Sequence, residues 1–188
     1  MSGVNEEMFD LTLHLIKKGP KFRSHTIVFE GEQASLKPTF AALAFCLIYV
    51  VVGLFLLGLA TAIYMGSRQV DLIIFLSILG ASITTFGITL LQPFMKWSVF
   101  DKKSGKYRNH VDRSLMLENI LSLQITNKMV LSKHGISYPC YELNVLTKFG
   151  RRLNVLNHND LAQMQADGEK LAEFLDVKLL DCQKEITL

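Results

Sequence analysis

Few side chains in this 188-residue sequence have the types and spacing that catalysis or metal binding requires. The five histidines share no interval suited to a metal or to a catalytic base. They are His14, His25, His110, His134 and His158. There is no GxSxG elbow and no glycine-rich phosphate loop, and single carboxylates such as Glu118 and Glu142 fit salt bridges or sheet edges. The sequence therefore predicts a non-enzymatic protein without a cofactor or a metal site.

The three cysteines have no spacing that indicates a disulfide framework or a zinc site. Cys46 lies within an apolar run, whereas Cys140 and Cys182 are far apart in a part of the chain that we expect to face a reducing compartment. Because no CxxC pair or Cys/His cluster occurs, the cysteines predict no redox chemistry.

Basic side chains form the one group with suggestive chemistry, the binding of anionic headgroups. The members are Lys102, Lys103, Lys106 and Arg108, soon after the second of two apolar runs, together with Arg151 and Arg152 on a later turn. A cation beside an anionic cytoplasmic leaflet gains about 1 kcal/mol. The alternative is that these cations only orient the chain in a membrane and bind no specific ligand. The formal net charge of +3 is too small to indicate a nucleic-acid-binding protein.

Two charge-free runs precede this basic group. No charged side chain occurs from Pro38 to Ser67 or from Leu72 to Met95, and either run is long enough to cross about 30 Å of hydrocarbon. The first run begins after an acidic opening and a predicted strand, so we expect a retained span and not a cleaved signal peptide. Each run is therefore predicted to be a transmembrane helix.

The charges that flank the runs predict their orientation. Lysine and arginine are frequent before the first run and after the second, whereas the connecting loop Gly66–Asp71 has only Arg68. Positive charge near the ends of spans is retained on the cytoplasmic side. Both termini are therefore expected in the cytoplasm, with the chain in a bacterial inner membrane and the short loop outside.

Small residues recur at three- and four-residue steps along the second run. They are Ser77, Gly80, Ala81, Thr84 and Gly87. Small residues on one helical face let another helix approach closely, so the favoured interpretation is that they pack the two spans against each other. A docking seam for another membrane subunit is the alternative. Neither run contains an acid, a base or a histidine, so transport is not supported.

Periodicity predicts the elements outside the two runs. Residues Asn5–Lys18 predict an amphipathic helix that packs on the protein's own domain or on a partner, and His25–Glu30 predicts a strand. After the second run, alternation predicts a hairpin of Trp97–Phe100 and Lys106–Arg108, followed by consecutive antiparallel strands with one buried face. These are Leu121–Thr126, Tyr141–Thr147 and Arg152–Leu156. Asn157–Asp160 supplies capping side chains, including that of His158, for a helix from Leu161 to about Asp176.

This order of elements resembles the bacterial pleckstrin-homology-like domains of small membrane proteins, over roughly Lys96 to Asp181. The resemblance lies in Trp97–Asp101 with the following Lys/Gly turn, Leu117–Ile120, Tyr141–Asn144, Gly150–Arg152 and Leu171–Leu175. It implies a binding or scaffolding module with no inherent chemistry. A complete domain of that type has seven strands, whereas the pattern after the second run predicts about five. The strand His25–Glu30 would add a sixth by pairing across the spans.

Together, these patterns predict a membrane protein of the α+β class. A two-span transmembrane helical hairpin, 38–95, joins a cytoplasmic N-terminal segment, 1–37, to a small antiparallel β-sheet domain with a C-terminal helix, 96–188. The favoured function is a membrane-anchored interaction protein, an accessory subunit or assembly factor of an inner-membrane complex. Its expected partners are membrane lipids and another membrane protein or a second copy of the chain. Two alternatives stay open, a membrane immunity or effector protein acting through its helices and an anionic-lipid-binding module.

Overall fold

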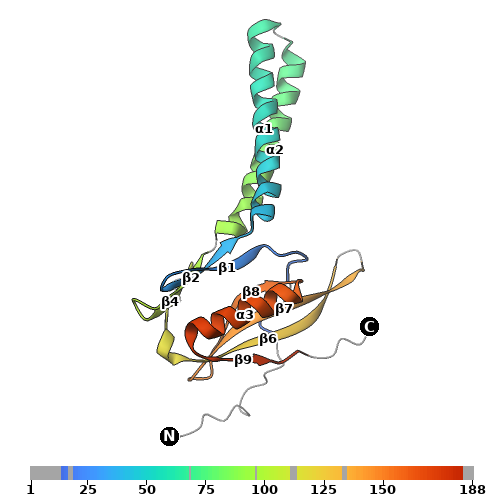
Figure 1. Cartoon of the computed structure of the whole chain (residues 1–188). Helices are drawn as coiled ribbons and strands as arrows, with labels where there is room; N and C mark the ends of the chain where they lie inside the picture. The colour runs from blue at the N-terminus through green and yellow to red at the C-terminus, as the bar shows by residue number, and fades with distance from the viewer. Residues whose placement is uncertain are drawn as a thin grey trace, which may run out of the picture. The chain divides into compact units, whose positions relative to one another are not determined.

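The computed structural model describes residues 14–16, 19–67, 69–95, 97–110, 114–132 and 135–183 of the chain. These residues form two compact units (Figure 1). Pro38–Lys96 is the first unit, which we call the helical hairpin. The second unit combines the segments on either side of it, Met1–Lys37 and Trp97–Leu188, and we call it the strand domain.

The helical hairpin consists of α1, Phe40–Gly66, and α2, Val70–Leu91, which continues as the 3₁₀ turn η2, Gln92–Met95. The hydroxyl of Thr39 accepts a hydrogen bond from the amide of Ala42 at 3.4 Å and so caps the start of α1. Both helices are long and apolar enough to cross a membrane, over Phe40–Gly66 and Val70–Met95. The predicted α+β class with two apolar helices is therefore confirmed.

The first sheet of the strand domain combines strands from both sides of the helical hairpin. Its strands are β1, His25–Glu30; β2, Gln33–Pro38; β3, Ser98–Asp101; β4, Lys106–Asn109; and β5, Leu115–Met116, in that spatial order. The decisive pairing joins β2, which precedes α1, to β3, which follows α2, with Ala34 opposite Phe100. The predicted strand His25–Glu30 is confirmed, but its expected pairing across the spans is wrong: β1 has β2 as its neighbour, and β2 makes the pairing across them.

The second sheet has the order β8-β7-β6-β9. Its strands are β6, Ile120–Leu131; β7, Ser137–Thr147; β8, Arg152–His158; and β9, Lys178–Asp181. The 3₁₀ turn η3, Leu117–Asn119, precedes β6, and α3, Leu161–Leu175, lies between β8 and β9. Among the described residues seven strands therefore follow α2, where the pattern predicted about five. The short β5 and the parallel β9 account for the difference.

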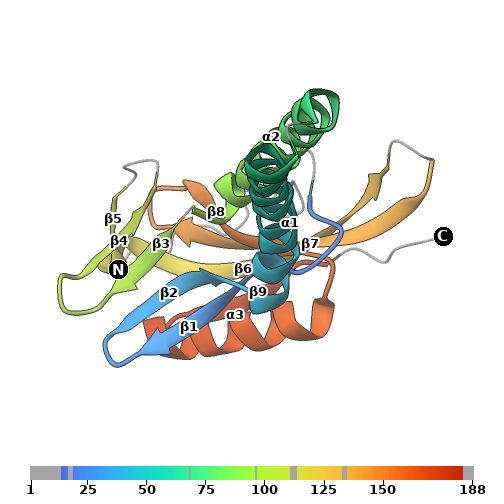
Figure 2. The ribbon, with the colours of Figure 1, turned by 90° about the horizontal axis from the view of Figure 1, so that it is seen from above.

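One face of the second sheet packs against α3 and the first sheet to form the core. Leu123, Leu143, Val145, Met164 and Leu171 have no exposed surface. Figure 2 shows β1 beside α3, where the rings of Phe29 and Phe174 are 5.6 Å apart. The side chain of Asp160 caps α3 by accepting from the amide of Gln163 at 3.1 Å, as the capping pattern predicted.

The pairing of β2 with β3 predicts a disulfide across the helical hairpin. Ser35 and Val99 are Cα partners in adjacent antiparallel strands, and directly opposite residues have the separation that a disulfide spans. We expect Ser35→Cys/Val99→Cys to oxidise to an intramolecular disulfide, measured as a mobility shift on non-reducing gels. The control, Ser35→Cys/Arg108→Cys, should not form it because Arg108 is opposite Val99 on the next strand. Equal oxidation of both pairs would contradict the pairing.

Candidate functional site

The small residues of α2 lie where the two helices come closest. A Cβ on Gly53 of α1 would lie 2.6 Å from the amide nitrogen of Thr84 and 2.8 Å from the carbonyl oxygen of Gly80. A Cβ on Gly87 would lie 2.9 Å from the amide nitrogen of Val50. Because these neighbours are backbone atoms, only glycine fits at the contact without a shift of a helix.

Most of the buried positions of each helix follow a seven-residue spacing, and Ala42 and Leu76 each lie four residues before the first of these. Cys46, Gly53 and Ala60 are buried along α1, and Gly80 and Gly87 are buried along α2. This interval keeps one seam of each helix against the other, as in left-handed coiled coils. The seam explains why the small residues of the sequence recur at three- and four-residue steps.

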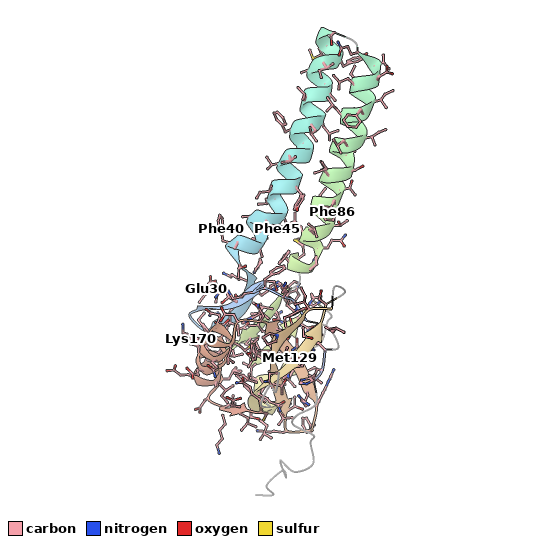
Figure 3. The ribbon with its side chains drawn as sticks, turned by 90° about the vertical axis from the view of Figure 1, so that its right-hand side faces the viewer. Glu30, Phe40, Phe45, Phe86, Met129 and Lys170 are labelled. Carbon is pink, nitrogen blue, oxygen red and sulfur yellow. The ribbon has the colours of Figure 1, made fainter. Side chains whose placement is uncertain are left out.

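Not every small residue of the predicted set belongs to this seam. Thr84 is half-buried and lies beside Gly53. Ser77 is also half-buried but is not among the atoms nearest to the seam glycines, and Ala81 is exposed. Near the end that continues into the strands, an edge-on aromatic series links the helices (Figure 3), with Phe45–Tyr49 and Tyr49–Phe86 centroid distances of 5.4 and 5.3 Å. The structure therefore places Gly80, Thr84 and Gly87 in the α1–α2 contact and leaves Ala81 outside it.

The hydroxyl groups of the helical hairpin donate to carbonyls of their own helix. Ser82 donates to Ile78 at 2.7 Å, Thr84 to Gly80 at 2.8 Å and Thr61 to Leu57 at 2.9 Å. A hydroxyl that is satisfied in this way needs no water, so these polar residues are compatible with an apolar surrounding.

The predicted basic residues are divided between two turns of the strand domain. Four belong to the β3–β4 hairpin, Lys102, Lys103, Lys106 and Arg108, whereas Arg151 lies in the β7–β8 turn and Arg152 begins β8. Two of the four have partners within the domain. The ammonium of Lys102 lies 4.6 Å from the centre of the Phe174 ring, and a guanidinium nitrogen of Arg108 lies 3.9 Å from a carboxylate oxygen of Asp101.

Asp101 shapes the β3–β4 turn that presents these cations. Its carboxylate accepts from the hydroxyl of Ser104 at 2.9 Å and from the amide of Lys103 at 3.0 Å. The hydrogen bond from the Ser104 hydroxyl is the main reason why the pKa of Asp101 is below its usual value. The turn therefore keeps a negative charge at its base and exposes Lys103 and Lys106.

A buried ion pair lies on the second face of the second sheet, so of the two interpretations of Glu142 the salt bridge is confirmed and the sheet edge is wrong. Glu142 is in the central strand β7 and has no exposed surface, and the Nζ of Lys128 on β6 lies 2.6 Å from its carboxylate. The same carboxylate accepts backbone hydrogen bonds from Leu15 at 3.0 Å and Ile16 at 3.3 Å. The prediction of one buried face was wrong, since this face is also buried and polar.

The N-terminal segment continues along this face past Cys140. A Cβ on Gly19 would lie 2.1 Å from Cys140 Sγ, and the hydroxyl of Tyr138 donates to the carbonyl of Gly19 at 2.8 Å. Burial raises the pKa of the Cys140 thiol to about 11, so this cysteine stays protonated and unreactive. The predicted helix Asn5–Lys18 lies mostly outside the described residues, and the described residues 14–16 are not helical.

A second buried carboxylate holds the next part of the same segment. Asp167 of α3 accepts from the hydroxyl of Thr26 at 3.2 Å and from the amide of Ile27 at 3.4 Å. Gln163, one turn earlier on α3, also donates to Asp167, at 2.7 Å. Sequence reasoning missed the hydrogen bonds from the N-terminal segment to both carboxylates, because these donors are more than a hundred residues away and no local pattern marks them.

His158 is the buried histidine of this region and predicts a pH effect. Burial lowers its pKa below the usual value, and the charges of Asp160 and Asp167 oppose that shift. The unfolded chain therefore takes up a proton more readily than the folded one, so stability falls as the pH drops below about 6.5. As the pH is lowered from about 7 to about 5, we expect the melting temperature of His158→Gln to fall less steeply than that of the native chain. The control, His110→Gln at an exposed position, should keep the native slope, and equal slopes for both variants would contradict this account.

In comparisons with known proteins, the sequence matches no family model and no curated protein. Within the described residues, no group of three histidine, cysteine, aspartate or glutamate side chains is arranged to hold a metal. The described residues form an apolar helical hairpin and a sheet whose strands come from both sides of that hairpin in sequence. Two buried carboxylates bind the N-terminal segment.

Proposed function

We propose that this chain is a membrane-anchored, non-enzymatic interaction protein. In this proposal α1 and α2 cross a bacterial inner membrane, both termini lie in the cytoplasm, and the strand domain meets partners there. The role is that of an accessory subunit or assembly factor, whose partners are the surrounding lipids and another membrane protein or a second copy. One observation carries the proposal: β2 and β3, which lead into and out of the helical hairpin, are hydrogen-bonded neighbours.

This pairing supports an anchoring role because one sheet receives the chain both before and after the helical hairpin in sequence. Only Thr39 separates β2 from α1, and only two residues separate η2 from β3. A domain that merely followed a span would need one flexible linker. Here two connections join the helical hairpin to the strand domain, and both are short.

The resemblance to pleckstrin-homology-like domains supports the interaction role. Such domains are binding modules, and a fold of this kind has no chemistry of its own unless a site is added. The basic β3–β4 turn and the N-terminal segment then become surfaces that a partner at the cytoplasmic face would meet.

Purification from the native membrane tests the proposed function. We expect a chain with a C-terminal affinity tag, cross-linked in the membrane and extracted in mild detergent, to retain either one specific membrane protein or a second copy. Membranes from cells that express the tag on an unrelated two-span protein provide the control. A chain that is recovered alone, with neither a partner nor self-association, would contradict the proposal.

A further inference from the structure

The strands β6 and β7 extend beyond the rest of their sheet. β9 pairs with β6 only over Ser122–Ile125, and β8 pairs with β7 only over Tyr141–Leu146. The remaining residues, Asn127–Leu131 and Ser137–Cys140, pair only with each other in the described sheet, and we call them the ribbon. Figure 2 shows the ribbon projecting past the other strands.

The two faces of the ribbon have different surroundings. On one face, Val130 and Cys140 are buried against the N-terminal segment at Gly19, which braces the ribbon. On the other face and at the tip, large apolar side chains are in the open: Leu131 is 71% exposed and Ile136 is 60% exposed. Leu131 and Ile136 therefore present apolar surface at this end of the ribbon.

The described residues at the tip make backbone hydrogen bonds with one another. The amide of Ser132 donates to the carbonyl of Ile136 at 2.9 Å, and the amide of Gly135 donates to Ser132 at 3.0 Å. Gly135 has a φ of +76°, which glycine adopts without strain. A loop that satisfies its own amides loses less when it leaves bulk water.

Charge and position both point to a lipid surface. The sequence has no carboxylate between Glu118 and Glu142, and Glu142 is buried and paired with Lys128. The ribbon therefore carries no negative charge that an anionic leaflet would repel. Figure 1 shows the ribbon rising to the side of the strand domain on which β2 ends, where the chain continues into α1.

We propose that the tip of the ribbon enters the headgroup region of the bilayer that α1 and α2 cross, as a third contact with the membrane. Leu131 and Ile136 are the inserted side chains, and the partner is the lipid surface itself. The inference rests on the proposed membrane anchoring and goes beyond it, because anchoring by two helices does not require the strand domain to touch lipid.

Fluorescence quenching in reconstituted vesicles tests this contact. Single cysteines replace Leu131, Ile136, Phe55 or Phe149 in a chain whose three native cysteines are alanine, and each carries an environment-sensitive thiol-reactive fluorophore. Phe55 is an exposed residue of α1. Phe149, 79% exposed, lies in the turn at the other end of β7, about 35 Å along the strand from the tip. The vesicles contain zwitterionic and anionic lipids with or without brominated acyl chains.

We expect brominated lipid to reduce the emission at positions 131 and 136 by a fraction closer to that at 55 than to that at 149. Emission at 131 and 136 that matches position 149 overturns the inference and leaves the anchoring intact. Shielding from aqueous iodide without quenching by brominated lipid also overturns it, because a protein surface then covers the tip. If position 55 is not quenched, the anchoring itself fails. Should the cysteine-free chain misfold, Leu131→Trp in a Trp97→Phe chain with its native cysteines allows the same measurement through tryptophan emission.

Discussion

A Gly53→Leu chain is expected to lose the close contact between α1 and α2. A side chain at this position would run into the backbone of Thr84 and Gly80, neither of which is able to rotate away. Forcing atoms into a packed contact costs about 1–3 kcal/mol, and more where a helix must move. We expect a lower melting temperature of the helical signal in mild detergent, measured by circular dichroism.

Gly58 provides a matched control on the same helix. Nothing lies within 4 Å of a Cβ built on Gly58, so Gly58→Leu adds the same side chain where there is space for it. We expect a change within about 0.5 kcal/mol, as for other substitutions away from packed features. Equal destabilisation by the two substitutions would show that α1 and α2 do not pack through Gly53.

The same contact changes how a docking seam on α2 must be tested. Substitution of Gly80 or Gly87 by leucine would disturb the helical hairpin itself, whether or not another membrane subunit binds there. Ala81 is exposed beside this seam, so Ala81→Leu alters the outer surface without entering the α1–α2 contact. An effect of Ala81→Leu on function would support the effector interpretation.

Loss of one member of the buried ion pair should have the largest effect in the strand domain. Lys128→Ala leaves the fully buried carboxylate of Glu142 with only the backbone amides of Leu15 and Ile16 among the donors described above. Removing one partner of a buried pair costs about 3–5 kcal/mol. We expect a corresponding fall in the free energy of unfolding, measured by denaturant titration in detergent.

A double substitution separates the lost charge from the lost packing. Lys128→Met/Glu142→Gln removes both charges, keeps similar volumes and retains an acceptor for the two amides, so it should recover most of the stability. Lys148→Ala, at an exposed lysine of the β7–β8 turn, is the control and should have little effect. A double variant as unstable as Lys128→Ala would mean that charge compensation is not what Lys128 provides.

The sequence predicted α1, α2 and α3 well because their signals are local. The absence of charge marks both apolar helices, and the helix α3 ends at Leu175, one residue before the predicted limit at Asp176. Asp176 instead caps α3 in the left-handed conformation, with a φ of 55°. The capping side chains before Leu161 were also recognisable, because capping depends on residues that are neighbours in sequence.

The strands that sequence reasoning missed depend on distant partners. Residues Gln33–Pro38 form a short segment that contains three polar residues and ends in a proline, and they form β2 because β3 lies beside them. The predicted strand began only at Tyr141, whereas β7 begins at Ser137 and includes Pro139, a residue that is rare inside sheets. Pro139 is tolerated in β7 because β8 does not extend that far, so the missing amide leaves no ladder bond unmade. The buried carboxylates Glu142 and Asp167 are further cases in which the partner lies on the other side of the helical hairpin in sequence.

Labelling of single cysteines in intact cells tests the membrane arrangement most directly. The chain carries one cysteine, either at Gln69, in the loop between α1 and α2, or at Phe149, in the strand domain, and is treated with a membrane-impermeant maleimide. We predict that position 69 reacts in intact cells and that position 149 reacts only after the membrane is broken. Labelling of position 149 from outside, or equal labelling of both positions before lysis, would contradict the account.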